Sequence, residues 1–97
     1  MHVHRISSAA TKYIFESAIK HASVIAFETL GDNMLLSWYD RDRDMESPGH
    51  VGECHDGRPT KEFWDYALNC GATLAVDFDD GRFVFCFRPL DEEVTLD

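Results

Sequence analysis

The sequence predicts an α+β fold: a two-layer sandwich with elements in the order α-β-α-β-β and two helices on one face of a small mixed sheet. Three patterns predict it. Residues 8–30 carry an apolar stripe with helical spacing, residues 33–39 alternate, and residues 73–87 have the pattern of a hairpin. A chain of 97 residues is enough for one domain, so the prediction is a single domain over residues 1–97.

The first helix is predicted over residues 8–30, where most apolar side chains fall within an arc of about 160° around the helix axis. Gly31 follows the last of them, and a residue without Cβ suits the left-handed end of a helix. Val24 and Phe27 fall outside the arc and also suit a strand. The alternative is a strand that starts after Ser23, which would give the sheet four strands in place of three.

The first strand is predicted over residues 33–39, "NMLLSWY", because apolar side chains alternate there between two faces. The connection that follows, residues 40–59, has three glycines, two prolines and no period, which is long for a compact domain. Regular alternation assigns Met34, Leu36 and Trp38 to one face of the strand, and Leu35, Ser37 and Tyr39 to the other.

The second helix is predicted over residues 60–70, with Thr60 as N-cap and Gly71 after its last residue. Residues 73–78 and 83–87 then form a hairpin around Asp80-Gly81, a dipeptide typical of a tight type I′ turn. The strands 33–39 and 73–78 are expected to be parallel and joined by a right-handed crossover through the second helix. Residues 90–97 are expected to be a frayed acidic tail.

Residues 1–39 and residues 40–97 differ in net charge. Of 18 acidic and 9 basic residues, residues 1–39 hold three of each, so residues 40–97 carry 15 acids against 6 bases. This field repels nucleic-acid phosphates and anionic lipid, so neither direct nucleic-acid binding nor membrane binding is expected. The charge is compatible with binding to a basic protein. One alternative is that this chain is an acidic decoy, which occupies the nucleic-acid-binding surface of such a protein.

The cysteines indicate the compartment. Three dispersed cysteines cannot all pair, which argues against a disulfide framework and favours a reducing cytoplasm. No stretch has the length and apolarity of a membrane span or an export signal. We therefore expect a cytoplasmic protein.

One stretch has metal-ligand chemistry. His50, Cys54 and His55 are residue types that bind zinc, and a single loop would supply all three, with His2 and His4 as candidates to complete the shell. The second paired ligand motif of a structural zinc site is missing, so no cofactor is the leading expectation and zinc the alternative. Cys54 and His55 also have the types of a thiol nucleophile and its base, but sequence neighbours are poorly placed to pair. An enzyme is therefore the less expected class.

The face of the sheet away from the helices is the candidate binding surface. With both helices on one face, the other is expected either to be covered by residues 40–59 or to bind a protein partner or a second copy. The leading functional prediction is a protein-interaction or self-associating module. Its candidate partner-binding residues are Leu35, Tyr39, Ala75 and Val84.

Two blocks carry a resemblance to known proteins. "LLSWYDRDRDMESPGHVGECH" and "YALNCGATLAVDFDDGRFVFCFRP" resemble a small prokaryotic α+β domain family that is uncharacterised as to function, over roughly residues 33–89. The resemblance implies a compact α+β domain. It implies no activity, cofactor or site residue.

Overall fold

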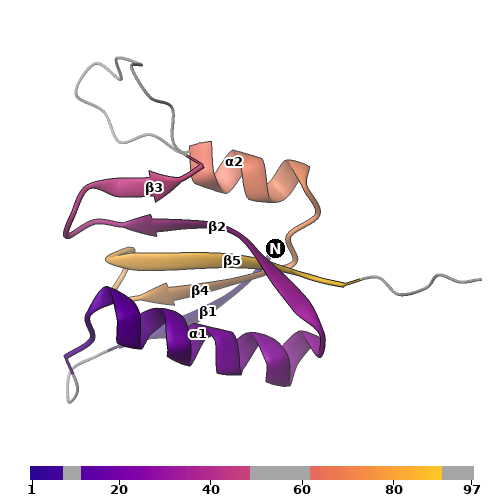
Figure 1. Cartoon of the computed structure of the whole chain (residues 1–97), viewed down its shortest axis with the longest axis horizontal. Helices are drawn as coiled ribbons and strands as arrows, with labels where there is room; N and C mark the ends of the chain where they lie inside the picture. The colour runs from indigo at the N-terminus through magenta and orange to yellow at the C-terminus, as the bar shows by residue number, and fades with distance from the viewer. Residues whose placement is uncertain (8–11, 49–61, 91–97) are drawn as a thin grey trace, which may run out of the picture.

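The computed structural model describes residues 1–7, 12–48 and 62–90. Its sheet has five strands in the spatial order β1-β4-β5-β2-β3, with β1 parallel to β4 and every other neighbouring pair antiparallel (Figure 1). The α+β class and the mixed sheet are thus confirmed. The elements in chain order are β1 His2–Ile6, α1 Phe15–Leu30, β2 Asn33–Asp40, β3 Met45–Ser47, α2 Glu62–Asn69, β4 Leu74–Phe78 and β5 Phe83–Pro89.

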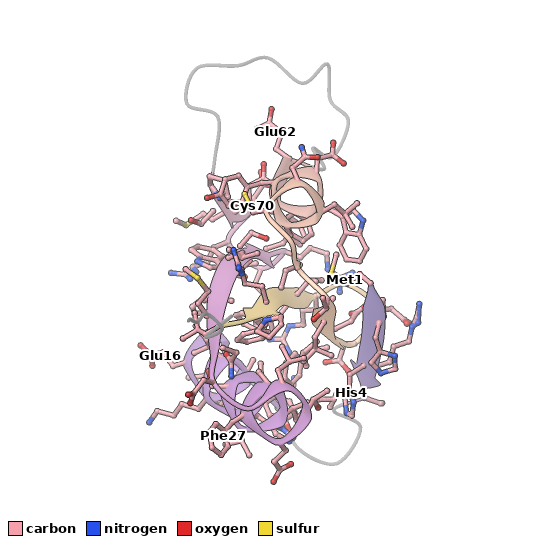
Figure 2. The ribbon with its side chains drawn as sticks, turned by 90° about the vertical axis from the view of Figure 1, so that its right-hand side faces the viewer. Met1, His4, Glu16, Phe27, Glu62 and Cys70 are labelled. Atoms are coloured by element: carbon pink, nitrogen blue, oxygen red, sulfur yellow. The ribbon has the colours of Figure 1, made fainter. Side chains whose placement is uncertain are left out.

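The two helices lie on opposite faces of the sheet, so the prediction that both cover one face is wrong. Ala18, Ala22 and Ala26 of α1 pack on one face, whereas Phe63 and Ala67 of α2 pack on the other. Seen along α1, the sheet lies between the two helices, and β1 forms one margin of it (Figure 2). The molecule therefore has three layers.

Connection handedness explains this arrangement. The strands β1, β2 and β4 run in the same direction. The chain crosses the sheet from β1 to β2 through α1, and it returns from β2 to β4 through β3 and then α2. Crossovers between parallel strands are right-handed in about 98% of cases. Two crossovers of the same hand that move in opposite directions must lie on opposite faces. The sequence pattern missed β1, so the first crossover could not be foreseen.

Residues 24–29 belong to the helix α1, so the predicted helix is confirmed there and the alternative of a strand after Ser23 is wrong. The helix begins at Phe15, later than the predicted Ser8, and residues 12–14 are not helical. At its start the hydroxyl of Ser17 accepts a hydrogen bond from the Ile14 N–H at 3.0 Å. At its end Gly31 has a φ of +74° and donates its N–H to the Phe27 carbonyl at 2.8 Å, as the terminal glycine predicts.

A bulge in β2 changes which side chains share a face. The pairing of β2 with β5 shifts register between Leu35 and Ser37. Because one extra residue reverses the alternation, Leu35 and Trp38 both pack on the α1 side, whereas Tyr39 packs on the α2 side. The predicted alternation is therefore wrong for Leu35.

The hairpin of β4 and β5 is confirmed, but its connection is longer than the predicted two-residue turn. Phe78 pairs with Phe83, which leaves residues 79–82 between the strands. Asp79, Asp80 and Gly81 have positive φ values of 53°, 55° and 94°, and the Asp77 carboxylate accepts a hydrogen bond from the Gly81 N–H at 2.6 Å. The strand β5 then lies between β4 and β2, so the crossover through α2 passes over it.

Neither of the helices that the structure describes is long and apolar enough to cross a membrane.

Candidate functional site

The predicted metal-binding loop lies outside the described residues. His50, Cys54 and His55 fall within residues 49–61, so zinc binding there stays a prediction, as does the acidic decoy. Among the residues that the structure does describe, no cluster of three or more His, Cys, Asp or Glu side chains is close enough to hold a metal ion.

The predicted partner-binding face is not an open surface. Ala75 and Val84 are buried beneath α2, and the ring of Tyr39 stacks on Phe63 of α2 with centroids 5.4 Å apart. Leu35 lies on the other face, among the side chains under α1. This face was expected to be covered by residues 40–59 or by a partner because both helices were placed on the other face, and that placement is wrong: α2 packs on it.

The interior under α2 contains one thiol and one buried hydroxyl. Cys86 is fully buried, and burial raises the pKa of its thiol to about 11. Ser37 pairs with Cys86 across the two strands and donates its hydroxyl to the Phe63 carbonyl at 2.7 Å. This bond joins β2 to α2. A neutral, inaccessible thiol is a poor nucleophile, so Cys86 is a packing residue.

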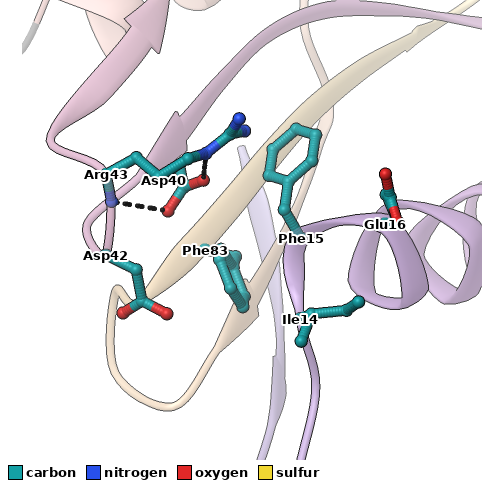
Figure 3. Close-up of a pocket in the computed structure, with 7 residues that line it drawn as sticks. All are labelled: Ile14, Phe15, Glu16, Asp40, Asp42, Arg43 and Phe83. Atoms are coloured by element: carbon teal, nitrogen blue, oxygen red, sulfur yellow. Dashed lines mark hydrogen bonds and ion pairs between the residues drawn. The ribbon is translucent and has the colours of Figure 1, made fainter.

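A pocket of about 290 Å³ lies between the start of α1 and the β2–β3 connection (Figure 3). Phe15 and Phe83 form its apolar wall, and Asp40 and Arg43 form part of its polar rim. Asp40 is buried and accepts hydrogen bonds from the Arg43 backbone N–H at 3.2 Å and from its Nε at 2.5 Å. The Arg43 guanidinium also lies over the Phe15 ring, 4.8 Å from its centroid.

A second arginine neutralises the outer part of that rim. Arg82 donates from Nε and Nη2 to the Asp42 carboxylate at 2.9 and 2.6 Å, and it lies over the Phe83 ring. The Arg82 guanidinium lowers the pKa of Asp42, and the carboxylate raises the pKa of Arg82. These pairs fasten the β2–β3 connection to the β4–β5 connection. The sequence did not indicate that Asp42 would pair with Arg82, forty residues away.

The strand β1 has backbone N–H and C=O groups that pair with no strand the structure describes. His2 donates its N–H to the Thr73 carbonyl at 2.9 Å, and the Ile6 carbonyl accepts from the Asp79 N–H at 2.8 Å. In a parallel pair, successive residues direct their backbone groups alternately toward and away from the neighbouring strand. The backbone groups of His2, His4 and Ile6 therefore face β4. Those of Val3 and Arg5 face outward, where no described strand lies beyond β1.

The two edges of the sheet differ. The strand β3 at one edge has three residues, which is one of the ways in which proteins protect a sheet edge. The strand β1 at the other edge has five residues, His2–Ile6, with neither a proline nor an acidic side chain. Figure 2 shows β1 at the margin of the molecule, with Met1 and His4 beside it. Sequence reasoning missed this edge, although "HVHRI" does alternate and could have signalled a strand.

Comparisons with known proteins agree with this fold. The crystal structure of a novel non-family-model protein from Archeoglobus fulgidus DSM 4304 is similar, with a TM-score of 0.73 and 26% sequence identity over 96% of this chain and 99% of that chain. No curated protein sequence matches. The sequence matches a family, described as a domain of unknown function, over residues 1–87. The chain therefore belongs to the DUF5619 family, in line with the resemblance to an uncharacterised small prokaryotic domain.

Proposed function

We propose that this chain is a self-associating protein-interaction domain in which β1 pairs in antiparallel fashion with β1 of a second copy. The observation that carries the proposal is the outward direction of the backbone N–H and C=O groups of Val3 and Arg5. An unpaired row of such groups is a template for an added strand. Two identical strands related by a two-fold axis complete each other, and the two sheets become one.

Charge supports a second copy as the occupant of this edge. The chain has a net charge of −9, so two copies repel each other over most of their surfaces. Residues 1–39 sum to zero, and β1 itself carries Arg5 and no carboxylate. The strand β1 therefore brings no negative charge of its own to an interface, and the carboxylates near it, Asp79 and Asp80, lie beside Arg5 and Ile6 at its C-terminal end.

The test is the mass in solution across the micromolar range, by sedimentation or multi-angle light scattering. The informative variant is Arg5→Pro, because proline removes an N–H that points outward and leaves the bonds of β1 to β4 intact. Its matched control is Arg5→Ala, which removes the side chain and keeps the N–H. We expect wild type and Arg5→Ala to dimerise and Arg5→Pro to remain a single chain.

A competing interface is the outer side of α1, where Phe27 is 62% exposed and Val24 is 55% exposed. The variant Phe27→Ser separates the two surfaces. A dimer lost in Phe27→Ser and kept in Arg5→Pro would move the interface to α1 and contradict the proposal. A mass of one chain for wild type at every concentration would refute self-association altogether.

A further inference from the structure

Two imidazoles lie on one face of the open edge strand. His2 pairs with Leu74 and His4 with Val76, and both of these β4 residues pack under α1. Paired residues in neighbouring parallel strands direct their side chains to the same face, so His2 and His4 both project on the α1 side. Both are exposed. Their Cα atoms are roughly 6.6 Å apart, because two residues of strand separate them.

The pairing of two β1 strands admits more than one register. With the two-fold axis at Val3, His2 of one copy lies directly opposite His4 of the other, in a non-hydrogen-bonded pair with Cα atoms about 4.5 Å apart. With the axis at His4, only the two His4 residues are opposite, and His2 faces Ile6. Only the first register gathers four imidazoles, at the corners of a rectangle roughly 5 by 6.6 Å.

We propose that these four imidazoles, His2 and His4 from each of two copies, bind one divalent transition metal of the zinc class at the two-fold axis. The inference rests on the proposed strand pairing. Imidazole is a preferred zinc ligand, structural zinc takes four ligands, and a Zn–N bond is about 2.0–2.1 Å long. Each Cβ lies about 4 Å from the axis, so all four rings can reach an ion above the sheet.

The site is incomplete in one copy. One β1 strand supplies two imidazoles, and the described part of the chain holds no cluster of three or more potential ligands. A metal would also decide the register, which is weakly specified where an edge strand is polar and exposed. The bound metal would add to the stability that the main-chain hydrogen bonds give the pair of strands, and each of those bonds contributes little on its own.

The experiment titrates zinc chloride into tag-free protein by calorimetry and measures the mass with zinc or with chelator. We expect one zinc per two chains, a dimer dissociation constant about tenfold or more lower with zinc, and loss of both effects in His4→Ala. A triple variant, His50→Ala with Cys54→Ser and His55→Ala, is the matched control for the loop candidate and should bind as wild type does. One zinc per chain, or loss of binding in the triple variant, would overturn the inference.

The two proposals fail differently. A dimer that forms with chelator present, depends on the Arg5 N–H and does not respond to zinc would refute the metal site and leave the strand pairing in place. Zinc bound at the same ratio by Val3→Pro, which removes the N–H at the centre of this register, with the dimer retained, would refute both the strand pairing and the site built on it. Loss of zinc binding and dimer together in Arg5→Pro supports both.

Discussion

Cys86 provides a sharp test of the interior under α2. Its thiol is fully buried between Ala75 and Ser37, its partners across the strands, and its pKa is raised from 9.0 to about 11. A pKa that is higher in the folded state means that the folded protein holds its proton more tightly than the unfolded chain does. This contribution to stability is complete below pH 9 and is lost as the pH rises through about 11.

The size of the effect follows from the two pKa values. Between pH 8 and pH 10 the linkage relation gives a loss on the order of 1 kcal/mol in the free energy of unfolding from Cys86 alone. Other groups also change protonation in this pH range, so their contribution to the pH dependence of stability must be subtracted. The variant Cys86→Ala keeps every other group, and its own pH dependence supplies the reference.

The assay is urea unfolding at pH 8 and pH 10 for two proteins that both carry Cys54→Ala and Cys70→Ala. One of them keeps Cys86 as its single thiol, and the other carries Cys86→Ala and has no thiol. We expect Cys86→Ala to be the less stable at pH 8, because it leaves a small cavity. Its deficit should shrink by about 1 kcal/mol at pH 10. Parallel pH dependences would show that the thiolate is tolerated, and the account of a dry interior under α2 would be wrong.

Three other changes test the packing. Phe85→Ala removes a fully buried ring from between Phe15 and Phe78 and should lower the free energy of unfolding by about 3–5 kcal/mol in urea melts, whereas a cost below about 1 kcal/mol would contradict a packed core. Ser37→Ala leaves the Phe63 carbonyl without this donor and should cost about 1–3 kcal/mol, with Ser37→Thr as a control that keeps the hydroxyl. Asp42→Asn should be less stable than wild type at pH 7, and the difference should shrink as the pH falls below 3.8, because the lowered pKa of Asp42 makes its contribution present above 3.8 and lost as the pH falls through the folded value. A difference that does not change with pH would argue against this ion pair.

Periodic segments with clear ends were predictable from sequence. The end of α1 follows from Gly31, and the faces of β5 follow from the alternation of Phe83, Phe85 and Phe87 with Val84 and Cys86. These features depend on residues close together in the chain. The beginning of α1 was not predictable in this way, because residues 12–14 continue the apolar pattern without being helical.

The errors concern relations between distant segments. The strand β1 has five residues and pairs with β4, some seventy positions later, so nothing local marks it as part of the sheet. Without β1, the opposite placement of the helices could not be derived. The bulge near Leu35 has no glycine or proline to signal it, and its effect on the face that Leu35 occupies appears only in the pairing with β5. The prediction of a partner-binding sheet face was wrong for the same reason, because it assumed that both helices lie on the other face.

The position of β5 has a consequence for synthesis on the ribosome. Of the strands that the structure describes, β5 is the last along the chain. It lies between β4 and β2, so it joins β1 and β4 to β2 and β3. Until residues 83–89 have been translated, two parts of the sheet exist without the strand between them, and the apolar face of α1 has no Phe83, Phe85 or Phe87 to pack against. Domains acquire their folds from the N-terminus onward during translation where contacts allow it. Here the contacts do not allow it, and a nascent chain that stalls before Phe83 exposes two unpaired strand edges to the chaperones around it.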